Sequence, residues 1–216
     1  MKPATKKSLA ALLAMSLWLP FALHAAPVDD AVSELQRDWE VIRYQTPSKE
    51  REKRFEALST KAHDTSTAFN GRSEALVWEG IILSSWAAER GGLGALSLVK
   101  QAKAVYEKAI EIDGNALDGS AYASLGVLYH KVPGWPIGFG DKAKAETLLK
   151  KALAINPNGI DPNFFYAELL MDTNRADQAM PYLDRALAAP PRSGRQVADA
   201  GRREEIKALM ARLNAR

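Results

Sequence analysis

Few side chains in this sequence have the type and spacing that chemistry requires. Two of its three histidines, His63 and His130, lie outside the N-terminal region, and the chain has no cysteine. No histidines or carboxylates are spaced like the ligands of a metal site, and no nucleophile motif such as Gly-x-Ser-x-Gly occurs. We therefore expect no metal, no cofactor and no catalytic residue, and the chain is not predicted to be an enzyme.

The segment KVPGWPIGFGD, residues 131–141, places unusual residues next to a titratable side chain. His130 precedes it and could exchange protons with Asp141, although a histidine packed at the edge of a groove is the expected role. A glycine-rich turn before a helix can bind an anion. Here no strand precedes the turn, no Gly-Lys-Ser/Thr follows it, and Asp141 would occupy the helix N-terminus itself. We expect Asp141 to cap the following helix and the prolines to order the loop.

The N-terminus has the pattern of an export signal. Three lysines precede an apolar run over residues 9–23, which ends in Ala25-Ala26-Pro27. The run is shorter than the roughly 20 residues that span a membrane, and small residues follow it. We predict a signal peptide at residues 1–25 and a mature chain that starts at Ala26 in the periplasm of a Gram-negative bacterium, with no membrane-spanning segment. An uncleaved membrane anchor is the alternative.

Removing this signal changes the charge balance. The chain has 29 Lys and Arg against 26 Asp and Glu, and three of the lysines but none of the acids lie in the predicted signal. The mature part therefore carries 26 basic and 26 acidic side chains and is formally neutral. A nucleic-acid-binding face needs a clustered excess of positive charge, so we expect no nucleic-acid partner.

Residues 26–216 are predicted to form a single domain in which one pattern occurs three times. The segments AKAVYEKAIEIDGN, AETLLKKALAINPN and AMPYLDRALAAPPR begin at Ala102, Ala145 and Ala179. Each has a small, a large and a small residue at its first, fifth and eighth places, which share one face of a helix. A glycine or proline then ends the helix.

A matching first helix precedes each of these segments. The three are EALVWEGIILSSWAAER with Gly80, SAYASLGVLYHKV with Gly126, and NFFYAELLMD with Ala167. Ala145 and Ala179 are 34 residues apart. The sequence therefore resembles tetratricopeptide-repeat (TPR) proteins, whose 34-residue unit is a pair of antiparallel helices. The resemblance covers residues 73–191 and implies an all-α solenoid of about three helical hairpins.

Helices are also predicted on both sides of these repeats. Before them, apolar stripes on either side of a break at Thr46-Pro47 predict a degenerate leading helix pair; the stripes are Val32, Leu35, Trp39 and Ile42, then Phe55, Leu58 and Ala62. After them, residues 195–214 are predicted to form a capping helix. Its apolar residues include Ile206 and Leu209, and we expect its charged face to lie in solvent.

The first two repeats are longer than the third between their paired helices. Compared with the third repeat, the first carries 10 extra residues and the second carries seven. Insertions at one place in adjacent repeats stack along one edge, so we expect them to form a shared lip beside the concave groove. The candidate residues for binding a ligand or partner lie in this groove and lip: Val77, Trp78, Ile81, Val127, His130, Trp135, Phe139, Phe164 and Met171.

Two functions fit a mostly apolar groove with an aromatic lip. The first is a periplasmic adaptor that binds a protein or peptide partner. The groove lacks the lysine- and asparagine-rich clamp by which chaperone-binding TPR domains hold a C-terminal carboxylate. The second is a small apolar ligand, because the exported TPR pattern with long insertions is similar to the T component of TPR-associated TRAP transporters. That family's lipid-anchoring cysteine is missing here. Trp135 and Phe139 either cover a ligand or pack over helix ends.

Overall fold

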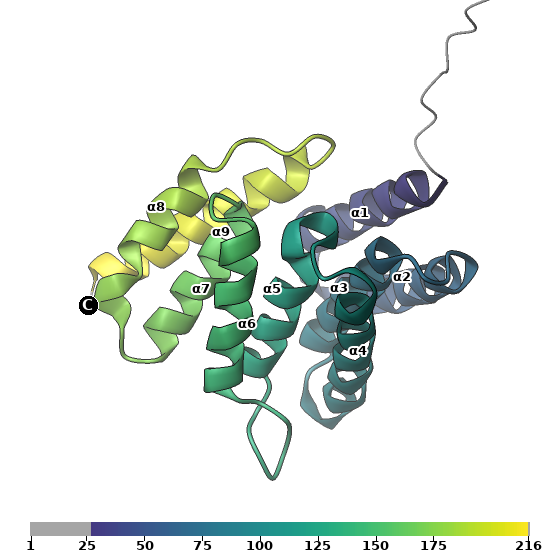
Figure 1. The fold of residues 1–216 in the computed structure, drawn as a ribbon, viewed down its shortest axis with the longest axis horizontal. Coiled ribbons are helices and arrows are strands. Elements are labelled where there is room, and N and C mark those ends of the chain that lie inside the picture. Colours follow the sequence, from purple (N-terminus) through teal and green to yellow (C-terminus); the bar gives the residue numbers. More distant parts are fainter. Residues whose placement is uncertain (1–26, 216) are drawn as a thin grey trace, which may run out of the picture.

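The computed structural model describes residues 27–215, so the predicted signal peptide at residues 1–25 and the start at Ala26 lie outside the described part. Within that part the chain is helical throughout, and the helices follow one another in a curved row of hairpins (Figure 1). The elements are α1 (Pro27–Gln45), α2 (Ser48–Ala68), α3 (Ser73–Arg90), α4 (Gly92–Asp113), α5 (Ala116–Lys131), α6 (Lys142–Ile155), α7 (Ile160–Asp172), the 3-10 turn η1 (Ala176–Gln178), α8 (Met180–Ala188) and α9 (Gln196–Asn214). The predicted all-α helical-repeat solenoid is confirmed.

Small residues let the paired helices approach closely, as their spacing predicts. A Cβ atom on Gly80 of α3 would collide with the Tyr106 ring of α4, and one on Gly126 of α5 would collide with Leu149 of α6. Both large residues are almost completely buried. Close packing of this kind is sensitive to a single added methyl group, so these contacts fix the spacing of each hairpin.

The leading pair, α1 and α2, packs against the first repeat. The two helices are separated at Thr46 and Pro47, where the sequence predicts a break. The Trp39 ring of α1 meets the Trp78 ring of α3 edge to face, with the centroids 5.9 Å apart. The leading pair therefore forms one wall of the concave side and belongs to the same core as α3.

The two insertions meet at one edge, where Gly138 faces Leu96, but they differ in structure and do not form two stacked loops. In the first repeat the extra residues lengthen the helices: α3 has 18 residues and α4 has 22, against 13 in α7 and nine in α8. A tight turn joins α3 to α4, and Gly91 and Gly92 supply its left-handed backbone, with φ of 64° and 58°. Only the second insertion forms a loop, at residues 132–141. Asp141 ends that loop and caps α6, as predicted, by accepting the amides of Ala143 and Lys144.

Helix α9 turns back across the concave side and exposes only part of its charged face. It contacts α7, α8 and also α1 at the other end of the chain. The Glu40 carboxylate of α1 accepts the backbone N–H of Ala198 at 3.1 Å, and the Tyr44 ring lies directly against Gly201. The expectation that the charged face of this helix is solvated holds for Glu204 and Lys207 but is wrong for Arg202, which is only 12% exposed. Arg202 pairs with Asp161 of α7 and with Glu205 of its own helix.

Candidate binding pocket

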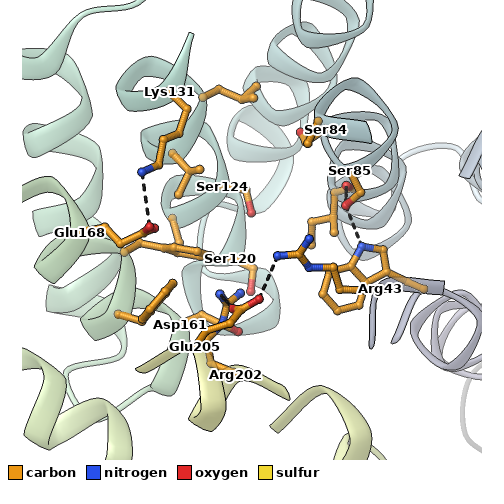
Figure 2. A pocket seen from close by; sticks show the side chains of 18 of the residues that line it. Arg43, Ser84, Ser85, Ser120, Ser124, Lys131, Asp161, Glu168, Arg202 and Glu205 are labelled. Carbon is orange, nitrogen blue, oxygen red and sulfur yellow. Dashed lines mark hydrogen bonds and ion pairs between the residues drawn. The ribbon is translucent and has the colours of Figure 1, made fainter. Parts of the chain in front are cut away.

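A pocket of about 600 Å³ occupies the concave side between α1, α3, α5, α7 and α9. Figure 2 shows serines of α3 and α5 facing the same space as charged residues of α1, α7 and α9. Because α9 contacts α1, the concave side is bounded at both ends of the row of helices. The space is a bounded pocket and not a groove that runs along the whole solenoid.

Four of the nine predicted site residues line this pocket: Trp78, Ile81, Val127 and Phe164. Each of the four lies on the first helix of a repeat, on the side that faces the pocket. Two other predicted site residues do not lie in the pocket, so their prediction is wrong. Val77 is fully buried with Ala109 of α4 and Ala121 of α5, and Met171 is buried in the main core, so neither lines the pocket.

The remaining three predicted residues lie around the loop after α5, outside the pocket lining. Trp135 projects into solvent, while the Phe139 ring packs against the Tyr129 ring with the centroids 5.3 Å apart. His130 is buried at the end of α5, where its Nε2 lies 3.1 Å from Asp172 Oδ2 of α7. The partner considered from the sequence, Asp141, is occupied in capping α6. The loop is therefore separate from the pocket.

Paired charges hold α9 over the floor of the pocket. Asp161 of α7 receives Arg202 Nε at 2.8 Å and Arg192 Nη1 at 2.7 Å. Burial raises the pKa of Asp161, but the attraction of the two guanidinium groups outweighs burial and holds the pKa at about 2. Arg43 of α1 donates to Glu205 of α9 at 2.8 Å, which ties the first helix to the last. Both carboxylates are therefore committed to arginines.

Aromatic rings form the apolar wall of the pocket. Trp39 donates its indole N–H to the Ser85 hydroxyl at 2.8 Å, which fixes the ring in place. The Arg195 guanidinium lies over the Trp78 ring, 4.9 Å from its centroid, and 5.9 Å from that of Trp39. A cation stacked on indole in this way gains attraction from the ring's electron density.

Arg195 is the least neutralised cation in the pocket lining that is also largely buried. Its nearest carboxylate, Glu40, lies 3.7 Å away, and Arg195 Nε has no hydrogen-bond partner among the described residues. Burial lowers the pKa of Arg195, and the neighbouring Arg192 lowers it further. Sequence reasoning missed this residue, although the basic excess after Pro191 is a signal that could have pointed to it. A ligand anion would relieve its unfavourable position.

Serines of α3 and α5 supply neutral hydrogen-bonding groups to the pocket. Ser84 and Ser85 donate to backbone carbonyls of α3, each at 2.8 Å, and Ser120 donates to Leu117 of α5 at 2.6 Å. Each of these hydroxyls keeps lone pairs that can accept a ligand N–H. Among the described residues that line the pocket there is no histidine to pair with these serines.

Comparison with known proteins supports the repeat assignment. Residues 137–213 match a family model described as tetratricopeptide repeat. The match begins in the loop after α5 and extends to the end of α9. It thus includes the capping helix and leaves α3 and α4 outside. No curated protein matches the chain.

Two solved structures align with most of this chain. Yeast Tom70 aligns with 16% identity and a TM-score of 0.49 over 85% of this chain, which is 34% of the Tom70 chain. TTC0263, a thermophilic TPR protein from Thermus thermophilus, aligns with 16% identity and a TM-score of 0.45, covering 85% of this chain and 99% of its own. The chain spans about a third of the length of Tom70.

Neither a metal-binding cluster nor a membrane-crossing helix is found between residues 27 and 215. Between residues 27 and 215, no group of three or more His, Asp or Glu side chains is placed to hold a metal ion. In the same range, none of the helices has the length and apolar character needed to cross a bilayer.

Proposed function

We propose that this protein is an exported TPR adaptor that holds a short segment of a partner protein in the concave pocket. The observation that carries this proposal is the pocket itself, in which the first helices of successive repeats present an apolar wall and free hydrogen-bonding groups to one space. TPR scaffolds commonly bind other proteins, and helical solenoids use their concave surface for this purpose.

The size of the pocket limits its occupant. A volume of about 600 Å³ lies within the range of roughly 300–1,000 Å³ that is usual for ligand sites. Because α1 and α9 close the concave side, a long helix could not lie along it. We therefore infer that the occupant is a chain end or an exposed turn of the partner.

The chemistry of the walls suggests what that segment contains. Ile81, Val127 and Phe165 are only partly buried and offer an apolar surface for one large side chain, and the serines can bind main-chain groups. Arg195, stacked on the indoles and poorly neutralised, would take a carboxylate. A segment with an apolar residue next to an acidic residue or a chain terminus satisfies all three features.

A second candidate is a small apolar ligand, in a protein that works like the T component of a TPR-associated TRAP transporter. The observation in its favour is the bounded shape of the pocket together with its paired tryptophans. An enclosed apolar site with a few polar groups is typical of small-molecule binding.

The test combines native mass spectrometry with site-specific crosslinking. A photo-crosslinking residue replaces Ser124 in the pocket or, as a matched control, Ile112 on the exposed side of α4. A protein crosslinked from position 124 but not from 112, and lost in an Arg195→Leu variant, supports the adaptor. A small mass retained by protein purified from the periplasm of its host supports the second candidate. A clean mass with no crosslink specific to position 124 rejects both.

A further inference from the structure

The three most exposed large apolar side chains of the described residues gather at one edge of the molecule. Leu93 is 86% exposed, Trp135 is 90% exposed and Ile137 is 62% exposed. Leu93 lies at the start of α4, and the other two lie in the loop at residues 132–141. The loop meets α4 where Gly138 faces Leu96, one helical turn from Leu93. Figure 1 shows this loop projecting beyond the ends of the neighbouring helices. We name Leu93, Trp135 and Ile137 the apolar tip.

The loop holds its exposed side chains on an ordered backbone. Gly140 donates its N–H to the Pro133 carbonyl at 2.9 Å, and Ile137 donates to Gly134 at 3.1 Å. At its base, the N–H of Asp141 bonds the Tyr129 carbonyl at 2.9 Å. Gly140 is required here, because a Cβ at this position would overlap the backbone of Val132. The ordered backbone of the loop therefore holds Trp135 in solvent, and the folding of the helices does not require an exposed tryptophan there.

The two segments that carry the apolar tip are rich in positive charge. The two segments that carry it, residues 90–103 and 131–144, contain six basic residues and one acidic residue: Arg90, Lys100, Lys103, Lys131, Lys142 and Lys144, against Asp141. The acidic residue is used within the fold, because Asp141 accepts two amides at the start of α6, at 2.9 Å and 3.0 Å. A chain that is neutral outside its first 25 residues therefore has a concentrated basic edge.

Carboxylates of α4 and α7 neutralise only part of this edge. Glu107 pairs with Lys103 at 2.8 Å, and Glu168 and Asp172 pair with Lys131 at 3.3 Å and 3.4 Å. The other four basic residues have no carboxylate partner within the described part of the chain. They are Arg90, Lys100, Lys142 and Lys144. The surface next to the apolar tip is therefore cationic.

We propose that the apolar tip inserts into the interfacial layer of a membrane rich in anionic phospholipid. Tryptophan favours this layer, where its ring meets acyl chains and its N–H stays hydrated. Binding at such an interface combines buried apolar area with attraction between basic side chains and anionic headgroups. A protein partner fits less well, because a stable interface buries about 1,200–2,000 Å² and needs a broad complementary surface, whereas these side chains project from a narrow loop and a helix end.

A single fluorescent label tests insertion at this position. Because the chain has no cysteine, Ile137→Cys gives the full-length protein one site for an environment-sensitive fluorophore. Vesicles of phosphatidylcholine with phosphatidylglycerol should brighten this label several-fold, and nitroxide lipids should quench it. The matched control is Ile112→Cys at the opposite end of α4, where no change is expected. The label reports only its own position, so vesicle binding by another part of the chain does not brighten it.

Variants separate the apolar from the electrostatic contribution. In the Ile137→Cys protein, Trp135→Ser with Leu93→Ser should weaken vesicle affinity about tenfold or more. Lys100→Glu with Lys144→Glu should weaken binding to phosphatidylglycerol vesicles and leave the weaker binding to pure phosphatidylcholine unchanged. Equal signals from positions 137 and 112, or a signal that survives Trp135→Ser with Leu93→Ser, would overturn the proposal. Brightening with protein concentration alone would overturn it too, because the tip would then bind a second copy.

Discussion

The charged residues under α9, which we name the pocket floor, and the apolar tip place charged and apolar side chains in opposite environments. The pocket floor consists of Asp161, Arg192, Arg202, Glu205 and Arg43. In the pocket floor, charges are largely withdrawn from water and each carboxylate is bound by arginines; at the tip, apolar side chains face water with unneutralised lysines beside them. Buried ion pairs are costly to break, whereas exposed apolar groups contribute little to folding. Substitutions in the pocket floor should therefore lower both the free energy of unfolding and the affinity for a ligand. Substitutions at the apolar tip should weaken membrane binding and leave the free energy of unfolding almost unchanged.

The largest expected effect comes from removing the central charge of the pocket floor. Asp161→Asn leaves Arg202 and Arg192 close together without their shared carboxylate, so we expect the free energy of unfolding to fall by about 3 kcal/mol. Urea denaturation followed by circular dichroism measures it. Glu204→Gln on the exposed face of α9 is the control and should change stability by less than about 0.5 kcal/mol. Equal stability of the two variants would mean that solvent weakens the ion pairs of Asp161 with Arg192 and Arg202 so much that they contribute little to stability.

A smaller effect is expected from His130, which lies between the two regions. Burial, and then the charge of Lys131, lower the pKa of His130 to about 4, although Asp172 opposes the shift. A pKa below the unfolded value of about 6.5 means that the fold favours neutral His130. This contribution is therefore complete above pH 6.5 and is lost as the pH falls toward 4. We expect a loss of about 2 kcal/mol between pH 7 and pH 4.5.

Three other titrations must be separated from that of His130. The pKa values of Asp161 and Glu146 are both about 2, so their contributions are lost below about pH 4. The bond to Glu79 raises the pKa of His63, so its smaller contribution has the opposite sign and is lost as the pH rises. His130→Gln should flatten the fall in stability between pH 6.5 and pH 4.5, and His63→Gln should not. A fall that persists in His130→Gln would place its cause elsewhere.

The sequence predicts the local packing of this fold and misses what depends on distant partners. Gly80 and Gly126 meet Tyr106 and Leu149 within one hairpin, so a short pattern contains all the information needed. The contact between Arg43 and Glu205 joins residues 162 positions apart, and no pattern within either helix reveals it. For this reason the sequence does not reveal that Arg202 and Glu205 of α9 turn toward the pocket, or that α9 contacts α1.

The same reasoning explains the mixed outcome at the candidate site. Helical register correctly places Ile81 and Phe164 on the concave side, because that face is set by the first helix alone. It fails for Val77, which α4 and α5 cover. The length of an insertion does not reveal its conformation either: the extra residues of the first repeat extend α3 and α4, whereas those of the second form a loop.

The smallest expected effect tests the comparison within a single loop. Trp135→Ser should change the free energy of unfolding by less than about 0.5 kcal/mol, because the ring has almost no protein contacts to lose. Phe139→Ala, four residues away, should cost about 1–2 kcal/mol, because its ring packs on Tyr129 and on the main core. Thermal unfolding of both variants gives the two values under the same conditions. A large loss in Trp135→Ser would show that the indole packs onto the protein in solution. The loop would then contribute to the core. The contrast between a pocket floor that stabilises the fold and an apolar tip that is free to bind would fail at Trp135, the most exposed residue of the tip.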